Sequence, residues 1–256
     1  MSATFDLTGR TVLITGASSG LGLRLARVAA AAGAKVALAA RRLDRLETFA
    51  SELREAGGIA HPVVMDVTDE ASVIAGFDAA RETLGEIDTV IANAGMNNEG
   101  LAAEVPIDAF DQVMAINVRG VFLTAREGAR RMMAAGSRES RRGRIVLISS
   151  IGALKVLPGL TAYCASKAAV VMMGRSLARE WANRGINVNV VCPGYVETEL
   201  NADWFGTEGG KAQVASFPRR RLMETEDLDA MMLYLASDAS RAVTGSVFTV
   251  DDGQTL

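Results

Sequence analysis

Short apolar runs recur along the whole chain, and longer helical patterns separate them. Seven such runs are rich in alanine or β-branched residues, and they lie at 11–15, 35–39, 62–65, 89–92, 144–149, 187–191 and 246–250. Several of these runs are apolar throughout rather than alternating, which is typical of strands whose two sheet faces are both covered by helices. Strand-like runs that alternate with helical stretches predict a parallel sheet built from strand–helix–strand units.

The stretches between these runs are long enough to form the crossover helices that such a sheet needs. The clearest helical patterns lie at 22–32, 43–56, 72–84, 120–135 and 162–183. We find no linker, repeat or low-complexity tract in the 256 residues, and that length suits one large domain. We therefore predict a single α/β domain over 1–256, with a doubly wound, mostly parallel seven-stranded sheet and helices on both faces.

Composition argues against several classes of function. A net charge of −3 and an aromatic content of 5% provide neither attraction to phosphate backbones nor a stacking surface, so we expect no nucleic-acid binding. We see no apolar run long enough to span a membrane and no secretory signal at the start of the chain. Cys164 and Cys192 do not make a disulfide framework, and free buried thiols favour a cytoplasmic location. No cluster has metal-ligand spacing, so we expect no catalytic metal.

A glycine-rich turn follows the first apolar run and opens directly into a helical pattern. It reads Gly16-x3-Gly20-x-Gly22 within TGASSGLG. The start of a helix presents free backbone N–H groups and the positive end of the helix dipole, and glycines let the backbone approach a pyrophosphate closely. The turn therefore predicts a dinucleotide-binding site at the first strand.

The second constellation has the spacing Ser150-x12-Tyr163-x3-Lys167. Tyr163 and Lys167 are four residues apart, so on a helix they share one face, and Ser150 follows a strand-like run that would deliver it to the edge of the sheet. A phenol ordinarily loses its proton near pH ~10. An ammonium about 4 Å away in a partly shielded site supplies roughly 4 kcal/mol, which predicts a lowered pKa for Tyr163 and a proton-transfer role near neutral pH.

With these motifs in place, the chain resembles the short-chain dehydrogenase/reductase family over essentially its full length. The matching elements occur in the family's order and spacing: TGxxxGxG at 15–22, Asp66-Val67, Asn93-Ala94-Gly95, Asn117, Ser150, Tyr163-x3-Lys167 and Pro193-Gly194. The resemblance implies a Rossmann fold, a nicotinamide cofactor, and hydride transfer between an alcohol and a carbonyl. It also implies a cofactor-binding half at about 1–120 and a catalytic half at about 121–256.

The resemblance assigns roles residue by residue. Tyr163 would be the acid/base, Ser150 would hydrogen-bond the substrate oxygen, Lys167 would bind the nicotinamide ribose, and Asn117 would hold a water of the proton relay. Asp66 would hold the adenine amino group. The full set implied to bind the cofactor is Gly16, Ser18, Ser19, Gly20, Leu21, Gly22, Asp66, Val67, Asn93, Ala94, Gly95, Tyr163, Lys167, Pro193, Gly194, Val196 and Thr198.

The form of the cofactor can be argued from charge. An NAD site of this type needs a carboxylate at the end of the second strand to accept from the ribose hydroxyls. Ala40 stands there instead, followed by Arg41 and Arg42, and guanidinium groups bind phosphate with charge-assisted hydrogen bonds. We therefore predict NADP(H) rather than NAD(H), unless the two arginines merely begin an exposed helix.

The substrate side is mixed apolar and polar, and it indicates a medium-sized ketone or alcohol. We expect Ser150, Met96, Tyr195 and Trp204 to face the substrate, with residues 199–224 as a mobile lid. The loop lysine, Lys155, either attracts an acidic substrate or is simply solvated.

Two other functions remain open at this point. One is a 3-oxoacyl-carrier-protein reductase, for which Arg138, Arg141, Arg142 and Arg184 would form a basic dock. The other is a non-catalytic dinucleotide-sensing protein, which the presence of the whole tetrad argues against. We expect a homotetramer or a dimer, since the family commonly pairs the two helices that carry Met132, Met133, Met172 and Met173.

Overall fold

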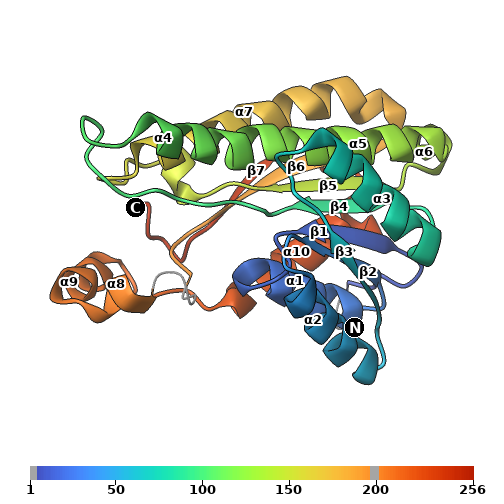
Figure 1. The fold of residues 1–256 in the computed structure, drawn as a ribbon, viewed down its shortest axis with the longest axis horizontal. Coiled ribbons are helices and arrows are strands. Elements are labelled where there is room, and N and C mark those ends of the chain that lie inside the picture. Colours follow the sequence, from blue (N-terminus) through green and yellow to red (C-terminus); the bar gives the residue numbers. More distant parts are fainter. Residues whose placement is uncertain (1–4, 197–201) are drawn as a thin grey trace.

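The computed structural model describes residues 5–196 and 202–256 as a sheet covered by helices on both faces (Figure 1). The strands are β1 (Thr11–Thr15), β2 (Lys35–Ala40), β3 (Ile59–Val64), β4 (Thr89–Ala92), β5 (Gly143–Ile148), β6 (Ile186–Pro193) and β7 (Val247–Val250). Their order in the sheet is β3-β2-β1-β4-β5-β6-β7, and each described ladder between them is parallel. The predicted doubly wound α/β fold is confirmed.

The helices form a layer on each face, as the alternating pattern requires. One layer holds α3 (Glu70–Leu84), α4 (Ile107–Met114), the π-helical turn η1 (Ala115–Gly120), α5 (Val121–Ala134), α6 (Ser137–Ser140) and α7 (Thr161–Trp181). The other holds α1 (Gly20–Ala31), α2 (Leu43–Glu55) and α10 (Asp229–Ala236). Each layer has its own core against the sheet, which explains why strands such as β1 and β5 are buried along their whole length.

Short 3₁₀ turns complete the connections, and two of them matter for the site and the base of the sheet. They are η2 (Ile151–Ala153), η3 (Ala182–Arg184), η4 (Thr225–Leu228) and η5 (Asp238–Ser240). The segment predicted as a lid, 199–224, begins outside the described residues and is otherwise partly helical, with α8 (Ala202–Gly206) and α9 (Glu208–Ser216) projecting from the body in Figure 1. The described part of the predicted lid is therefore mostly helical from 202 to 216.

The sequence-based strand boundaries are within two residues of the structure except at the start of the third strand. The third strand was expected at 62–65, but β3 begins at Ile59 because the whole segment pairs with β2, from Ile59 opposite Lys35 to Val64 opposite Ala40. The first residues of this strand include His61 and Pro62, which do not fit the apolar pattern used to predict strands. At the edge of a sheet, proline is tolerated because one side of the strand needs no ladder hydrogen bonds.

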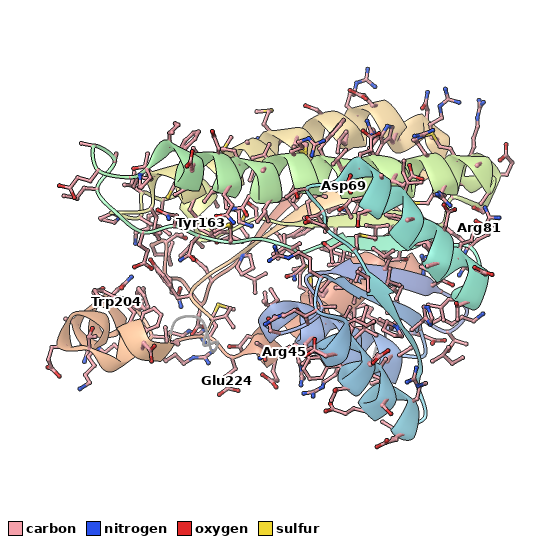
Figure 2. The ribbon with its side chains drawn as sticks, viewed as in Figure 1. Arg45, Asp69, Arg81, Tyr163, Trp204 and Glu224 are labelled. Carbon is pink, nitrogen blue, oxygen red and sulfur yellow. The ribbon has the colours of Figure 1, made fainter. Side chains whose placement is uncertain are left out.

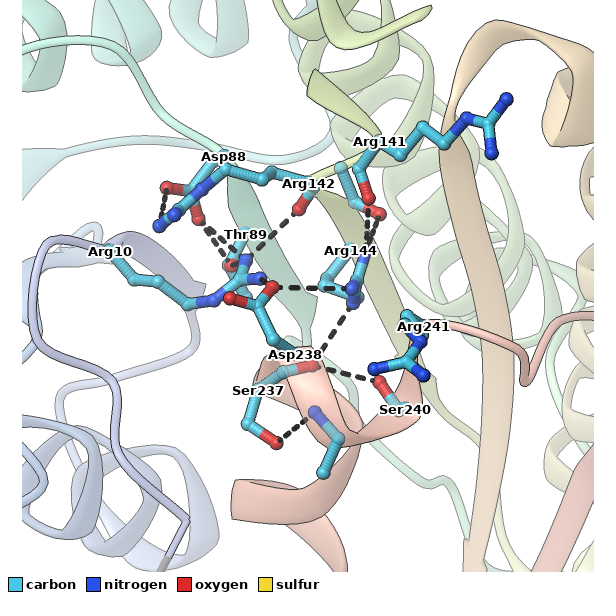
Figure 3. A network of polar contacts seen from close by, with 12 residues as sticks. Arg10, Asp88, Thr89, Arg141, Arg142, Arg144, Ser237, Asp238, Ser240 and Arg241 are labelled. Carbon is cyan, nitrogen blue, oxygen red and sulfur yellow. Dashed lines mark hydrogen bonds and ion pairs between the residues drawn. The ribbon is translucent and has the colours of Figure 1, made fainter. Parts of the chain in front are cut away.

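A buried ionic network ties the amino ends of the central strands to η5 (Figure 3). Arg10 and Arg144 are each 1% exposed. The Arg10 guanidinium donates to Asp88 Oδ1 at 3.1 Å and to Asp238, and Arg144 Nε donates to the Ser237 carbonyl at 3.2 Å. Burial and the neighbouring Arg10 lower the pKa of Arg144 to about 10. The network closes the base of the sheet and leaves the opposite, carboxyl edge for the site.

Candidate active site

The glycine-rich turn after β1 is shaped so that only glycine fits at its key positions. A Cβ on Gly22 would lie 2.3 Å from the Gly16 carbonyl oxygen, and Gly16 itself has φ +70° and closely contacts Ala94. Within the described part of the chain, the N-cap residue Ser19 makes no side-chain capping hydrogen bond to α1. The first N–H groups of α1 therefore remain available to an anion at this turn.

Arg42 reaches from the end of β2 to this same turn. Its Nη2 donates to Ser18 Oγ at 2.9 Å and to Ser19 Oγ at 3.5 Å. Arg41 is also close to the site, because it contributes to the lowered pKa of Asp66. One guanidinium group and two serine hydroxyls thus meet beside the α1 N-terminus, and the second guanidinium, that of Arg41, lies near Asp66. Such groups can bind an additional phosphate on the cofactor.

The next two strands place their first post-strand residues beside the turn. Asp66 accepts hydrogen bonds from Thr68 Oγ1 at 2.7 Å and from Thr68 N at 2.9 Å, and these lower the pKa of the Asp66 carboxyl. Thr15 Oγ1 accepts from the backbone N–H groups of both Asn93 and Ala94 at 3.1 Å, which joins the ends of β1 and β4. Val67 packs against Gly120, whose hypothetical Cβ would lie 2.8 Å from Val67 Cγ2.

Ser150 and Tyr163 come together at the carboxyl edge of the sheet. Ser150 follows β5, is 8% exposed, and accepts a hydrogen bond from Gly152 N at 3.1 Å. Its hydroxyl also lies close enough to the phenol of Tyr163, in the first turn of α7, to lower the pKa of that phenol. The neighbouring Ser149 points elsewhere, because its hydroxyl donates to the Lys167 carbonyl at 2.8 Å. The alternation of side chains along the chain thus directs the two serines to different partners.

Lys167 lies one turn along α7 from Tyr163, and it is almost completely buried. Its ammonium donates to the Ile148 carbonyl at 3.1 Å and lies 5.6 Å from the centre of the Tyr163 ring. Burial lowers the pKa of Lys167 to about 8, a shift that the Cys192 thiol opposes.

The sequence argument about the Tyr163 pKa was wrong for this structure. Burial raises the pKa of the phenol above its ordinary value, and the hydrogen bond with Ser150 only partly opposes that rise. Lys167 does not offset the burial, because its ammonium lies beside the Ile148 carbonyl rather than against the phenol oxygen. Tyr163 therefore holds its proton at neutral pH.

Asn117 lies inside the π-helical turn η1 and is fully buried. Its Oδ1 accepts from Met96 N, and its Nδ2 donates to Met96 O and to Ser166 Oγ, at 2.8, 2.8 and 3.0 Å. Ser166 Oγ in turn donates to the Tyr163 carbonyl at 2.7 Å. The amide thus joins the loop after β4 to the catalytic helix, with both of its N–H protons already in use.

The residues expected to face substrate are distributed unevenly. Tyr195 lies close to Tyr163, since its phenol contributes to the raised pKa of Tyr163. Its ring stacks on Phe217 at 5.7 Å between ring centres and meets Phe205 edge-on at 5.5 Å. Trp204 is 49% exposed and donates through Nε1 to Gln213 within the α8–α9 segment. Figure 2 shows Tyr163 and Trp204 at the same end of the molecule, on different layers.

The remaining predicted cofactor residues follow β6. Pro193 ends this strand, and Gly194 N donates to the Val250 carbonyl at 2.9 Å. Val196 is buried and pairs with Met223 in an isolated parallel bridge. Thr198 lies outside the described residues.

Comparison with known proteins shows which protein family this chain resembles. A family model described as enoyl-(acyl carrier protein) reductase matches residues 16–255. A 2-(S)-hydroxypropyl-CoM dehydrogenase 3 from Xanthobacter autotrophicus is 34% identical over 254 residues, covering 97% of this chain and 98% of its own. An inactive 2-(S)-hydroxypropyl-CoM dehydrogenase 2 from the same organism is 37% identical over 236 residues, covering 90% of this chain and 99% of its own.

A solved structure agrees with these sequences. The gluconate 5-dehydrogenase from Burkholderia cenocepacia, in complex with NADP and tartrate, has a TM-score of 0.93 and 34% identity, covering 98% of this chain and 97% of that one.

The chain is a short-chain dehydrogenase/reductase. It is accordingly an oxidoreductase that acts on a CH–OH or C=O group with a nicotinamide dinucleotide. Membership also agrees with the sheet topology and with the placement of the glycine-rich turn. Within the described residues, no helix of this short-chain dehydrogenase/reductase is long and apolar enough to cross a membrane.

Sequence reasoning missed four residues that position this site. Thr15 accepts hydrogen bonds from the backbone of Asn93 and Ala94. Ser166 accepts one from the Asn117 amide, and Gln213 accepts one from the Trp204 indole. The fourth, Gln254, accepts from Tyr195 N through Oε1 at 2.6 Å. Thr15 is the first residue of the TGxxxGxG motif, although no contact was assigned to it, and Ser166 stands next to Lys167, so both could have been found from the motifs. Gln254 is 59 residues from Tyr195, and nothing local in the sequence marks the contact.

Proposed function

We propose that this protein reduces the carbonyl of a small ketone to a secondary alcohol with NADPH, and catalyses the reverse oxidation with NADP⁺. The observation that carries the proposal is that the Ser150 hydroxyl lies close enough to the Tyr163 phenol to lower its pKa, at the edge of the sheet where the buried Lys167 ammonium donates to the Ile148 carbonyl at 3.1 Å. This pair stands over the buried Lys167 ammonium. The cofactor supplies the hydride when it is bound, and the protein's residues orient the substrate and supply the proton.

The raised pKa of Tyr163 suits the reductive direction. Reduction builds negative charge on the carbonyl oxygen, and a phenol that holds its proton at neutral pH can donate it to that oxygen. Ser150 Oγ already accepts from Gly152 N, so its own proton can be directed at the same oxygen. Two hydroxyl donors in a site sheltered from water stabilise the developing charge.

Asn117 is proposed to act through its hydrogen bonds. It fixes the backbone of Met96 and, through Ser166, the first turn of α7. The relay water implied by the family resemblance would have to use the second lone pair of Oδ1 or a backbone group, because both Nδ2 protons are engaged.

NADP(H) rather than NAD(H) is proposed from the charges around the turn. The residues fit a phosphate on the adenosine ribose, since Arg42 bonds Ser18 and Ser19, and Arg41 lies near Asp66. The end of β2 carries Ala40 in place of a carboxylate that would repel the phosphate. The NADP complex of the Burkholderia cenocepacia relative supports the same choice.

The test is Tyr163→Phe, which removes the transferable proton and keeps the ring. Turnover should fall by about a hundredfold or more with NADPH binding retained, and Ser150→Ala should lower it by about 10²–10³. The matched control is Tyr234→Phe, since Tyr234 packs against Phe5 outside the site. Cofactor binding can be followed by fluorescence, and turnover with a panel of ketones, oxo-acyl thioesters and enoyl thioesters. Normal turnover by Tyr163→Phe would contradict the assignment.

The carrier-protein alternative is weakened by position. Arg138, Arg141, Arg142 and Arg184 lie around α6 and η3, where β5 and β6 begin, whereas Ser150 follows the far end of β5. Figure 1 shows α6 at the opposite end of the molecule from the segments that bear the site. Six residues of strand span about 20 Å, so a carrier docked at α6 would have to bridge that distance to bring its acyl group to Tyr163.

The non-catalytic alternative has one supporting observation, a relative named as inactive. In this chain, however, Ser150 lies close enough to Tyr163 to lower its pKa. Asn117 donates to Ser166, and Lys167 donates to the Ile148 carbonyl. Absence of turnover on every substrate of the panel, with tight NADPH binding, would favour this alternative.

An oligomer built on α5 and α7 is also proposed. Of the four methionines expected there, Met132 is buried in the core and Met172 is 60% exposed. Phe122 is 37% exposed and lines an open apolar depression with Met114 and Met173. Sedimentation should give a dimer or tetramer, and Phe122→Glu with Met172→Glu should shift it toward monomer. A monomer in the unmodified protein would reject the proposal.

A further inference from the structure

A cavity of about 200 Å³ lies between the loop after β5, the α9 segment and the C-terminal residues. The cavity adjoins the reaction site. One of its lining residues, Ile151, directly follows Ser150, and another, Tyr195, lies close enough to Tyr163 to raise the pKa of its phenol. A cavity of about 150 Å³ accommodates a benzene-sized molecule. The space is therefore large enough for the part of a small substrate that lies beyond its reacting carbon.

The lining of this cavity carries one charge. Its described residues are Ile151, Lys155, Val156, Leu157, Pro158, Tyr195, Gln213, Ser216, Phe217 and Gln254. Lys155 is the cation, and this described lining contains no carboxylate. The other polar groups are amides and hydroxyls, which can donate hydrogen bonds to an anionic oxygen.

The Lys155 ammonium is held at the rim of the cavity by the C-terminal segment. Its Nζ donates to the Gln254 carbonyl at 2.9 Å. Gln254 is 2% exposed and is itself fixed to Tyr195 through Oε1, which accepts from Tyr195 N at 2.6 Å. An ammonium has three donors, so two protons remain to bind an anion from a position that is already ordered.

The acidic groups near the cavity do not neutralise the charge of Lys155. The acidic Asp252 is paired with Arg219 at 3.1 Å and with Arg221 at 2.8 Å. Glu99 lies near enough to contribute to the raised pKa of Tyr195, but it is exposed and is not part of the cavity lining. Lys155 is exposed as well, so water screens the attraction between these two groups, while the Gln254 carbonyl keeps the Lys155 ammonium beside the cavity.

We propose that Lys155 binds a carboxylate at the end of the substrate remote from the reacting carbonyl, so that the preferred substrates are short oxo acids and the corresponding hydroxy acids. This inference rests on the proposed function. Lys155 is then a specificity-determining residue, and it acts on substrate binding rather than on proton or hydride transfer.

The experiment compares a short oxo acid with its methyl ester, both reduced with NADPH, and measures the ratio of their kcat/KM values. The ester keeps the carbonyl and the chain but removes the charge. The unmodified protein should favour the acid by about tenfold or more, which corresponds to about 1.4 kcal/mol. Lys155→Met should bring the ratio close to one, chiefly through KM for the acid, while Lys155→Arg should retain much of the preference.

The matched control is Lys211→Met, which removes the same charge from α9 where Lys211 pairs with Glu208. The control should keep the acid preference of the unmodified protein. Equal use of acid and ester by the unmodified protein, or an acid preference that survives Lys155→Met, overturns the inference and leaves the proposed function standing. Failure of the proposed function is distinct, because it would appear as no Tyr163-dependent reduction of any ketone.

Discussion

Replacing Arg42 with methionine should separate the two cofactors. Arg42 is exposed, and its guanidinium is held at the glycine-rich turn by Ser18 at 2.9 Å. A unit charge pair at 4 Å is worth about 1 kcal/mol in water and about 4 kcal/mol near a protein surface. Because the arginine is solvated, we use the value of about 1 kcal/mol per charge pair. The phosphate carries up to about two charges, so the loss of Arg42 should cost about 2 kcal/mol of NADPH binding. The KM for NADPH should therefore rise about 30-fold.

The assay is the initial rate with NADPH and with NADH at low ionic strength. NADH lacks the phosphate, so its KM should not change, and added salt should raise the KM for NADPH in the unmodified protein more than in the variant. The control is Arg45→Met, since Arg45 is an exposed arginine three residues further along the chain, within α2. An unchanged KM for NADPH in Arg42→Met would refute the assignment. The converse variant, Ala40→Asp with Arg41→Ile, should favour NADH.

Three further outcomes follow from the structure. Gly22→Ala should lower the free energy of unfolding, measured in denaturant, by about 2 kcal/mol or more. The reason is that the new Cβ would lie 2.3 Å from the Gly16 carbonyl oxygen. The control Gly206→Ala should be nearly neutral, because a Cβ there meets nothing within 4 Å. The pKa of Lys167 is lowered to about 8, so the folded protein loses that proton before the unfolded chain does. Relative to Lys167→Met, its unfolding free energy should be constant below pH ~8 and rise by about 2 kcal/mol by pH ~9.5; a flat difference would contradict the burial argument. Amide exchange over 202–217 should slow when NADPH and substrate are added, and equal exchange in both states would reject a lid.

Local patterns were sufficient for the architecture and for much of the candidate site. Short runs rich in alanine or β-branched residues predicted all seven strands, and several of these runs are apolar throughout because strands covered on both faces have no polar side to display. The glycine-rich turn followed from steric need, and the i, i+4 spacing of Tyr163 and Lys167 placed both on α7. The spacing Ser150-x12-Tyr163 selected Ser150, and the structure brings Ser150, Tyr163 and Lys167 to one edge of the sheet.

Tertiary structure decided the features that depend on distant segments. The α8–α9 segment has few apolar residues, and its order relies on packing such as that of Phe205 against Tyr195, which no local pattern reveals. The same holds for Gln254, which anchors both Lys155 and Tyr195 from the end of the chain. Proximity in sequence also could not determine the sign of the Tyr163 pKa shift. The sign depends on how completely the fold removes water from the phenol and on where it directs the Lys167 ammonium. In this structure burial has the larger effect, and it raises the pKa of Tyr163.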